Sequence, residues 1–205
     1  MAISNYRSVL RSAVRGLWSG AIDTAQFDDN MRLAISRYLT EAFAAGAKEC
    51  GIKMDELTID EQLVLADILT AETSFVSGLA TAVNESSRAN KGKLTPLYGR
   101  VELWVNRYND VKNQAKILVC KDQKLEWIYG DTNVHCSTCL RLHGKVKRAS
   151  QWQASGIHPQ QPPNDALECG GWACACTLQP TDKPVTKGPL PRFRGKKMLV
   201  METTL

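Results

Sequence analysis

Apolar side chains recur every three or four residues through residues 28–50, the spacing that brings side chains to one face of an α-helix. Gly51 follows directly and favours the end of a helix. The pattern therefore predicts one long amphipathic helix. Its apolar positions are Met31, Ala34, Ile35, Tyr38, Leu39, Ala42 and Phe43.

A second apolar stripe follows the stretch TIDE, residues 58–61. The Thr58 side chain can accept from the backbone of Glu61, and the Glu61 side chain can reach back to Thr58, which is the arrangement of a capping box. We expect one helix to start here and to end at the polar run NESSRANKGK. Its stripe comprises Leu65, Ile68, Leu69, Phe75, Val76, Leu79 and Val83.

A third long helix is expected from the stretch LTPLYGR, where Thr95 suits the N-cap and Pro96 suits the first helical position. Three stripes of this kind are most simply the core of a helical bundle, so we predict an N-terminal helical domain over residues 1–120 and assign no cofactor site within it. The apolar positions of this third helix are Leu97, Val101, Trp104, Val105, Tyr108, Val111 and Ala115.

The pattern changes after Cys120. The stretch KLEWIYG resembles a short strand ended by Gly130, and GKVKRASQW resembles a second strand and a turn. The segment GIHPQQPPNDALECGG that follows is rich in proline and glycine and has few apolar residues with which to build a core of its own. Such a small domain usually needs a disulfide or a metal to hold it folded. The predicted fold class is therefore α+β, mainly α: a helical bundle, then a small cysteine-rich α+β module.

Positive charge is concentrated at the end of the chain. The formal net charge is +5, and residues 181–205 carry six lysines and arginines against two acidic residues. We interpret this segment as an extended basic tail that touches nucleic acid or a protein partner, or else as a solvated tail without a partner. The candidate contact residues are Arg192, Arg194, Lys196 and Lys197.

Neither a membrane span nor a signal peptide is expected. No run of about 18 consecutive apolar residues occurs, and the amphipathic start of the chain lacks the apolar core of a signal peptide. We therefore expect a cytosolic chain that makes no membrane contact.

Five of the seven cysteines lie in one segment: Cys136, Cys139, Cys169, Cys174 and Cys176. Two cysteines separated by two residues can bind one metal ion, and a structural zinc takes four such ligands. Gly170 and Gly171 give the backbone the freedom to bring the third cysteine to the last two. The leading hypothesis is structural zinc, with His135 and His143 as reserve ligands. Two alternatives stay open: disulfides in an oxidised particle, or reduced and merely buried thiols.

The remaining two cysteines, Cys50 and Cys120, are expected to be ordinary buried residues of the helical part. An enzymatic use of the cysteine segment is not favoured. A zinc deaminase needs a glutamate in an H-x-E stretch before its CxxC, and the stretch VHCSTC has none. Nothing in the sequence distinguishes one histidine as the partner of a catalytic thiol. We therefore predict a non-catalytic protein.

The stretch from Trp127 to Pro180 resembles the C-terminal motif of the Mu F-like minor head proteins, the phage head-morphogenesis family. The similarity covers about a quarter of the chain, and the preceding helical part is similar only in general character. The commoner family form has a histidine three residues before its C-x-C pair, where this sequence has Gly171, and Cys169 stands two residues earlier. The matching residues are Trp127, Asp131, Cys136, Cys139, Leu142, Gly144, Val146, Pro162, Pro163, Cys174, Cys176 and Pro180.

This resemblance implies a minor virion protein of a tailed phage or prophage. It would act in head morphogenesis near the portal or the head–tail connection, with the portal or the major capsid protein as partner and packaged DNA as a contact of the tail. It would reside in the virion, and in the host cytoplasm during assembly. A second interpretation is a nucleic-acid-binding zinc module outside any virion, because four basic residues follow the first cysteine pair. An enzyme that uses the Cys/His site is the third. The four basic residues are Arg141, Lys145, Lys147 and Arg148.

Overall fold

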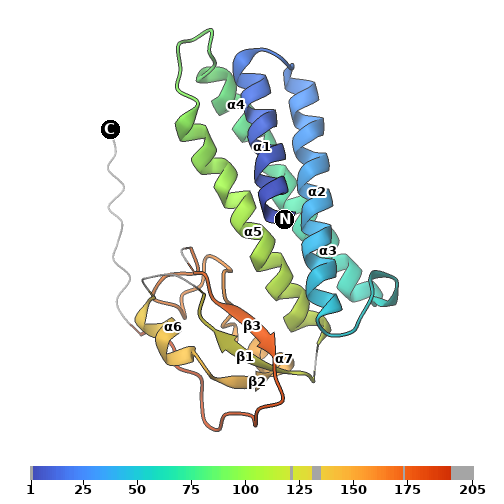
Figure 1. The fold of residues 1–205 in the computed structure, drawn as a ribbon, viewed down its shortest axis with the longest axis vertical. Coiled ribbons are helices and arrows are strands. Elements are labelled where there is room, and N and C mark those ends of the chain that lie inside the picture. Colours follow the sequence, from blue (N-terminus) through green and yellow to red (C-terminus); the bar gives the residue numbers. More distant parts are fainter. Residues whose placement is uncertain (1, 121, 131–134, 173, 195–205) are drawn as a thin grey trace. The chain divides into compact units, whose positions relative to one another are not determined.

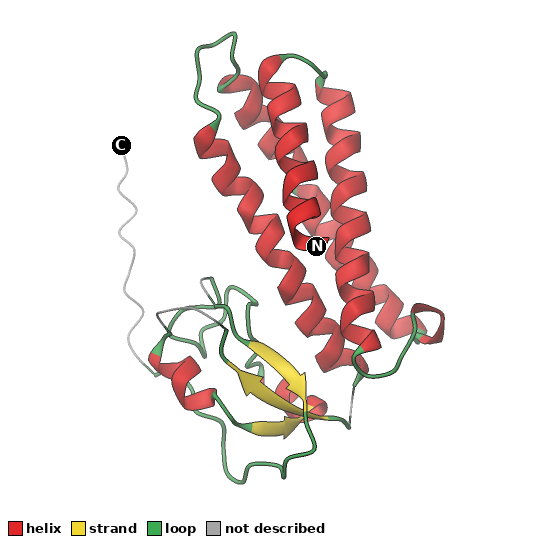
Figure 2. Ribbon diagram, in the orientation of Figure 1, coloured by secondary structure: helices red, strands yellow, loops and turns green. Residues whose placement is uncertain are grey.

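The computed structural model describes residues 2–120, 122–130, 135–172 and 174–194. The chain divides into two units, of which the first comprises Met1–Gln123 and the second begins at Lys124. The first unit is helical (Figures 1 and 2). Its elements are α1 (Ala2–Ser19), α2 (Thr24–Lys48), the short 3₁₀ helix η1 (Met54–Glu56), α3 (Ile59–Ser74), α4 (Val76–Glu85) and α5 (Thr95–Val119).

The predicted capping box at the start of α3 is confirmed. Thr58 Oγ1 accepts from the backbone N–H of Glu61 at 3.3 Å, and Glu61 Oε2 accepts from the backbone N–H of Thr58 at 2.9 Å. Helix α2 begins earlier than the apolar pattern indicates, because Asp23 forms a second capping box with Gln26. The hydrophobic stripe marks only the part of a helix that faces the core, so it misses this polar first turn.

Two details of the helices differ from prediction. The stripe after Thr58 was expected to form one helix, but the chain turns at Phe75, which ends α3, and α4 begins at the next residue. The Phe75 ring is 61% exposed although the stripe predicts it buried. At the start of α5 the N-cap is Leu94, so Thr95 is the first helical residue and Pro96 is the second, one position later than predicted.

Packing of α2 against α5 is unusually close at Gly46. A Cβ atom placed there would lie only 2.8 Å from the Cβ of Ala115, and it would also collide with the backbone carbonyl of Lys112. Real Cβ atoms do not approach a neighbour this closely, so only glycine allows the two helices to meet at this point. The core around this contact contains most of the apolar positions that the three stripes predict.

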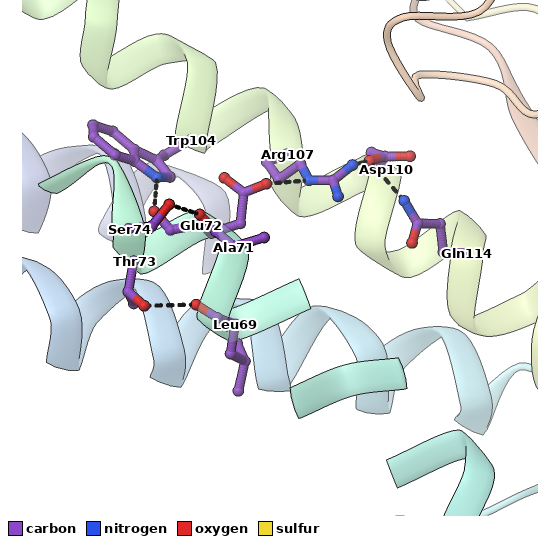
Figure 3. A network of polar contacts seen from close by, with 9 residues as sticks. All are labelled: Leu69, Ala71, Glu72, Thr73, Ser74, Trp104, Arg107, Asp110 and Gln114. Carbon is purple, nitrogen blue, oxygen red and sulfur yellow. Dashed lines mark hydrogen bonds and ion pairs between the residues drawn. The ribbon is translucent and has the colours of Figure 1, made fainter. Parts of the chain in front are cut away.

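A polar network links α3 to α5 within the bundle (Figure 3). Arg107 Nε donates to Glu72 Oε1 at 2.6 Å, and the guanidinium also pairs with the buried carboxylate of Asp110. Trp104 Nε1 donates to the backbone carbonyl of Glu72 at 3.2 Å, and Gln114 donates to Asp110 at 3.0 Å. The charges are thus paired where burial would otherwise make them costly.

Cys50 and Cys120 form a disulfide, which corrects the expectation that both are ordinary buried thiols. Their Cα atoms lie 5.4 Å apart, within the usual range for a disulfide, and the bond joins positions 70 residues apart in the sequence. Cys50 follows the end of α2, and Cys120 caps the end of α5. Nothing in the local sequence around either cysteine indicates the other, because their proximity depends on how the two long helices pack.

The second unit is built on a three-stranded antiparallel sheet with strand order β2-β1-β3. The predicted strand KLEWIYG is β1 (Lys124–Ile128), and GKVKRASQW contains β2 (Val146–Arg148) followed by the helix α7 (Ala149–Ser155). The remaining elements are α6 (Ser137–Leu142) and β3 (Thr177–Pro180). The coarse fold class, mainly helical with a small sheet and a cysteine cluster, is therefore as predicted. The larger side chains of this unit's core are Leu125, Trp127, Leu142, Val146, Trp152, Ile157, Leu167 and Leu178.

Residues 181–194, expected to be part of an extended tail, lie along the second unit. The backbone N–H of Thr186 donates to Val146 O at 2.9 Å, and the Thr186 hydroxyl accepts from the Val146 N–H at 3.0 Å. The backbone N–H of Phe193 donates to Ala166 O at 2.8 Å. Lys183 pairs with Glu126, a mostly buried carboxylate, at 2.7 Å. This segment therefore adds hydrogen bonds to the module.

Candidate metal centre

The first cysteine pair lies at the start of α6. Cys136 is the N-cap of this helix, and its sulfur accepts a hydrogen bond from the backbone N–H of Cys139 at 3.3 Å. The hydrogen bond folds the CxxC stretch back on itself, so both sulfur atoms lie on the same side of the turn. Cys139 is buried, whereas Cys136 is partly exposed.

The second group of cysteines arrives from the loop before β3. Gly170 and Gly171 both have positive φ, at 60° and 84°, as the predicted turn requires. Gly130, just after β1, lies against the backbone of Ala175, because a Cβ at position 130 would collide with the Ala175 carbonyl and approach its Cβ to 2.8 Å. This contact holds the C-x-C stretch against the end of the sheet.

The fold brings all five predicted cysteines together in two overlapping clusters. Cys136, Cys139 and Cys169 form one, and Cys139, Cys174 and Cys176 form the other; within each cluster the sulfur atoms lie within 4.8 Å of one another. Cys139 belongs to both. Its sulfur lies 3.9 Å from that of Cys174, close to the separation of about 3.8 Å that a tetrahedral zinc with Zn–S bonds of about 2.3 Å imposes. The donor set and its spacing therefore fit a zinc ion.

The pKa values of the clustered cysteines are shifted in opposite directions. Hydrogen bonding of the Cys139 thiol with its neighbours Cys169, Cys174 and Cys176 raises the pKa of Cys139 above its usual range. The same interaction lowers the pKa of Cys174, and it is the main cause that lowers the pKa of Cys176 to about 4. Adjacent thiolates repel one another, so a divalent cation is the natural counter-charge for a cluster of this kind.

Hydrogen bonds fix the loop that carries Cys169 to the helix that carries Cys139. Glu168 Oε2 accepts from the backbone N–H of Ser137 at 2.6 Å. Hydrogen bonding with Ser137, through its side chain first and its backbone N–H second, lowers the pKa of the Glu168 carboxyl group. The backbone N–H of Glu168 donates to the buried hydroxyl of Thr138 at 3.3 Å. Such contacts one layer outside the ligands orient the ligands themselves. The sequence carries no motif that marks Thr138 or Glu168 for this role.

The two reserve ligands, His135 and His143, lie outside both cysteine clusters. Their rings pack against the ring of Tyr129, with centroid distances of 4.5 Å for His135 and 3.9 Å for His143. The third histidine, His158, is largely buried beside Gln161, and burial lowers its pKa. Within the described residues, the candidate ligands of the clusters are therefore sulfur atoms alone.

The predicted contact residues of the basic tail are only partly described. Arg192 donates to the backbone carbonyl of Ser155, and its own carbonyl accepts from Arg141 at 3.5 Å, so this arginine contacts the module. Arg194 is exposed. Lys196 and Lys197 lie outside the described residues.

The basic residues after the first cysteine pair also make contacts within the module. Lys147 Nζ donates to the backbone carbonyls of Thr186 and Gly188 at 2.7 and 2.8 Å. Arg141 donates weakly to Ser137 O at 3.4 Å, in addition to its contact with Arg192. At least two of the four cations therefore have roles in holding the segment of residues 186–192.

Among the described residues, one helical stretch, Ile59–Glu85, is long and apolar enough to cross a membrane by length and composition. A helix of a soluble bundle passes the same test, and the chain turns within this stretch at Phe75. The expectation that the protein makes no membrane contact stays a prediction.

Comparison with protein-family models, with curated proteins and with solved structures finds no match to this chain.

Proposed function

We propose that this chain is a minor structural protein of a tailed-phage head, in which a zinc ion bound by the cysteine clusters holds the C-terminal module folded. The observation that carries the proposal is that Cys136, Cys139, Cys169, Cys174 and Cys176 come together in two overlapping clusters that share Cys139. These residues include the four cysteines of the motif that resembles the Mu F-like minor head proteins. The described part of that motif lies in the second unit, which begins at Lys124.

The zinc ion would act as a cross-link. Cys139 lies on α6, and Cys174 stands 35 residues later, just before β3. The intervening segment carries β2 and α7 and supplies core side chains such as Val146 and Trp152. Because the thiolate ligands come together only when this segment is folded, the free energy of metal binding becomes free energy of folding. A small domain cross-linked by a metal ion suits a position that bears mechanical load in a filled head.

The proposed partners follow from the resemblance and from the surfaces available. The helical unit presents exposed apolar side chains at Ile59, Leu63 and Phe75, which suit contact with the portal or the major capsid protein. The exposed Arg194 begins the basic end of the chain, which would contact packaged DNA. We propose the virion as the final location and the host cytoplasm as the place of assembly.

A non-catalytic role is favoured because the described histidines lie outside both cysteine clusters. A catalytic zinc site keeps one coordination position for water or substrate and needs an acid or base beside it. The structure arranges five sulfur donors as two triads that share Cys139, and we propose that four of these donors fill the coordination positions of one zinc ion.

The alternative of a nucleic-acid-binding zinc module rests on the basic residues after Cys139. The contacts of these basic side chains make this alternative less favoured, because Lys147 and Arg141 donate to backbone carbonyls of the module. A free DNA-binding surface would present such side chains to phosphates instead.

Particle association tests the proposed function. Intact particles from a producing strain are treated with protease and nuclease, and their peptides are identified by mass spectrometry. We expect peptides of this chain at low copy number in the protected fraction. Absence from particles, together with normal head assembly in a strain that lacks the gene, would contradict the proposal. Salt-sensitive binding of the isolated protein to duplex DNA would then support the zinc-module alternative.

A further inference from the structure

Two tryptophans of the second unit lie side by side in its core. The rings of Trp127, on β1, and Trp152, on α7, have centroids 5.7 Å apart, and both side chains are fully buried. Their indole N–H groups differ. Trp152 Nε1 donates to the backbone carbonyl of Leu125 at 3.0 Å. Trp127 Nε1 is buried and has no hydrogen-bond partner of ordinary geometry among the described residues.

A buried N–H without a partner destabilises a fold by about 1–3 kcal/mol, so native structures contain few of them. The position of Trp127 identifies the group that it faces. Trp127 pairs with Leu178 across β1 and β3, and Cys176 stands two residues before Leu178 on the same chain. Residues two apart on an extended strand face the same side, so Cys176 and Leu178 both lie on the side of the sheet that the Trp127 ring occupies. The Cys176 sulfur is buried there beside the indole, which makes it the acceptor nearest in register to the unpartnered N–H.

We propose that Trp127 Nε1 donates a hydrogen bond to the thiolate of Cys176 when Cys176 is bound to the metal, which makes Cys176 a ligand and Trp127 its positioning residue. A neutral thiol is a weak acceptor, whereas a metal-bound thiolate keeps negative charge and accepts well. The buried N–H is thus satisfied in the metal-loaded protein. This inference rests on the proposed zinc site and selects one ligand within it.

The role of Trp127 differs from that of an ordinary core residue. A donor to a metal-bound sulfur reduces the charge that the sulfur gives to the metal and fixes the direction of the bond. Removing the N–H while keeping an aromatic ring at position 127 should therefore change both the affinity for the metal and the electronic spectrum of the site, and the same replacement at position 152 controls for the lost ring volume. Removing the N–H of Trp152 should change neither, because its acceptor is a backbone carbonyl.

The test compares Trp127→Phe with Trp152→Phe in the full chain. Metal affinity is measured by chelator competition with Zn²⁺, and the site is monitored by the sulfur-to-metal charge-transfer absorption of the Co²⁺ form. We expect W127F to bind zinc about 10–100-fold more weakly and to shift the Co²⁺ charge-transfer band. W152F should keep the wild-type spectrum and an affinity within a few-fold of wild type, although it also loses thermal stability.

The outcomes separate this inference from the zinc proposal. Failure of the wild-type chain to bind zinc would contradict the metal site itself. Wild-type binding, together with a W127F variant of unchanged affinity and unchanged Co²⁺ spectrum, would overturn the role of Trp127 alone.

A measurement on the wild-type protein covers the case in which W127F does not fold. In protein loaded with ¹¹³Cd²⁺, a hydrogen bond to a ligand sulfur transmits scalar coupling from the metal nucleus to the indole proton. We expect such coupling at Trp127 and none at Trp152. Equal absence of coupling at both tryptophans would overturn the inference.

Discussion

The substitution Gly46→Ala tests the closest packing contact in the helical unit. The added Cβ would lie 2.8 Å from the Cβ of Ala115 and would collide with the backbone carbonyl of Lys112, both on α5. Carbon atoms in contact are normally about 3.5–4.0 Å apart, so α2 and α5 must separate locally by about 1 Å. A backbone carbonyl has no alternative rotamer, and the strain therefore spreads into the helix pair.

Two effects of this substitution oppose each other. Alanine favours a helix over glycine by about 1 kcal/mol, whereas overpacking of a core costs about 1–3 kcal/mol or more. Because the collision involves backbone, we expect the cost to exceed the gain. The net loss in the free energy of unfolding should be about 1–2 kcal/mol, measured by urea denaturation followed by circular dichroism.

Gly99→Ala is the matched control on α5. Gly99 is exposed, and a Cβ there would meet nothing within 4 Å. This variant should therefore be more stable than the wild type by about 0.5–1 kcal/mol. A G46A variant that is stabilised to the same extent as G99A would refute the close approach of α2 and α5.

Three further predictions concern contacts that the sequence does not reveal. Burial opposes ionisation of Glu49, but hydrogen bonds of the Glu49 carboxylate with two lysines of α5 outweigh burial and lower its pKa. Ionised Glu49 therefore stabilises the fold at a pH above its unfolded pKa, and this stabilisation is lost as the pH falls through the folded pKa. Glu49→Gln should cost about 1–3 kcal/mol at pH 7, and a deficit of the same size at a pH where Glu49 of the folded wild type is protonated would contradict this account. Under oxidising conditions the double variant C50S/C120S should have a free energy of unfolding about 4 kcal/mol below that of the wild type, because it lacks the cross-link that closes a loop of 70 residues. In excess reductant the variant and the wild type should be equally stable. A deficit that persists in reductant would show that packing is the cause. Lys147→Met should release the segment after Pro184 to limited proteolysis with the fold otherwise intact, and unchanged cleavage would show that its contacts with Thr186 and Gly188 are dispensable.

Local features of the sequence predicted the parts of the fold that depend on neighbours in the chain. The stripe through residues 28–50 identified the buried face of α2, and the pairing of Thr58 with Glu61 identified the start of α3. The break at Phe75 was missed because apolar spacing continues across it and no glycine or proline marks the turn.

Long-range pairings could be predicted only where the chemistry itself implied them. The five clustered cysteines indicated a common site, because thiols in one segment with metal-ligand spacing have few other uses. The disulfide of Cys50 with Cys120 depends on the packing of α2 against α5, and no local signal precedes it. The contact of Thr186 with Val146 was missed because a segment rich in proline and lysine is typical of a solvated tail.

We propose above that one zinc ion bound to the cysteine clusters holds the second unit folded. Native mass spectrometry of the intact chain, purified without chelator and under mild reduction, measures this directly. We expect the mass of the chain plus one zinc ion, and loss of that ion in Cys139→Ser, because Cys139 belongs to both clusters. A metal-free wild-type chain whose five clustered thiols all react freely with a thiol reagent would contradict the account.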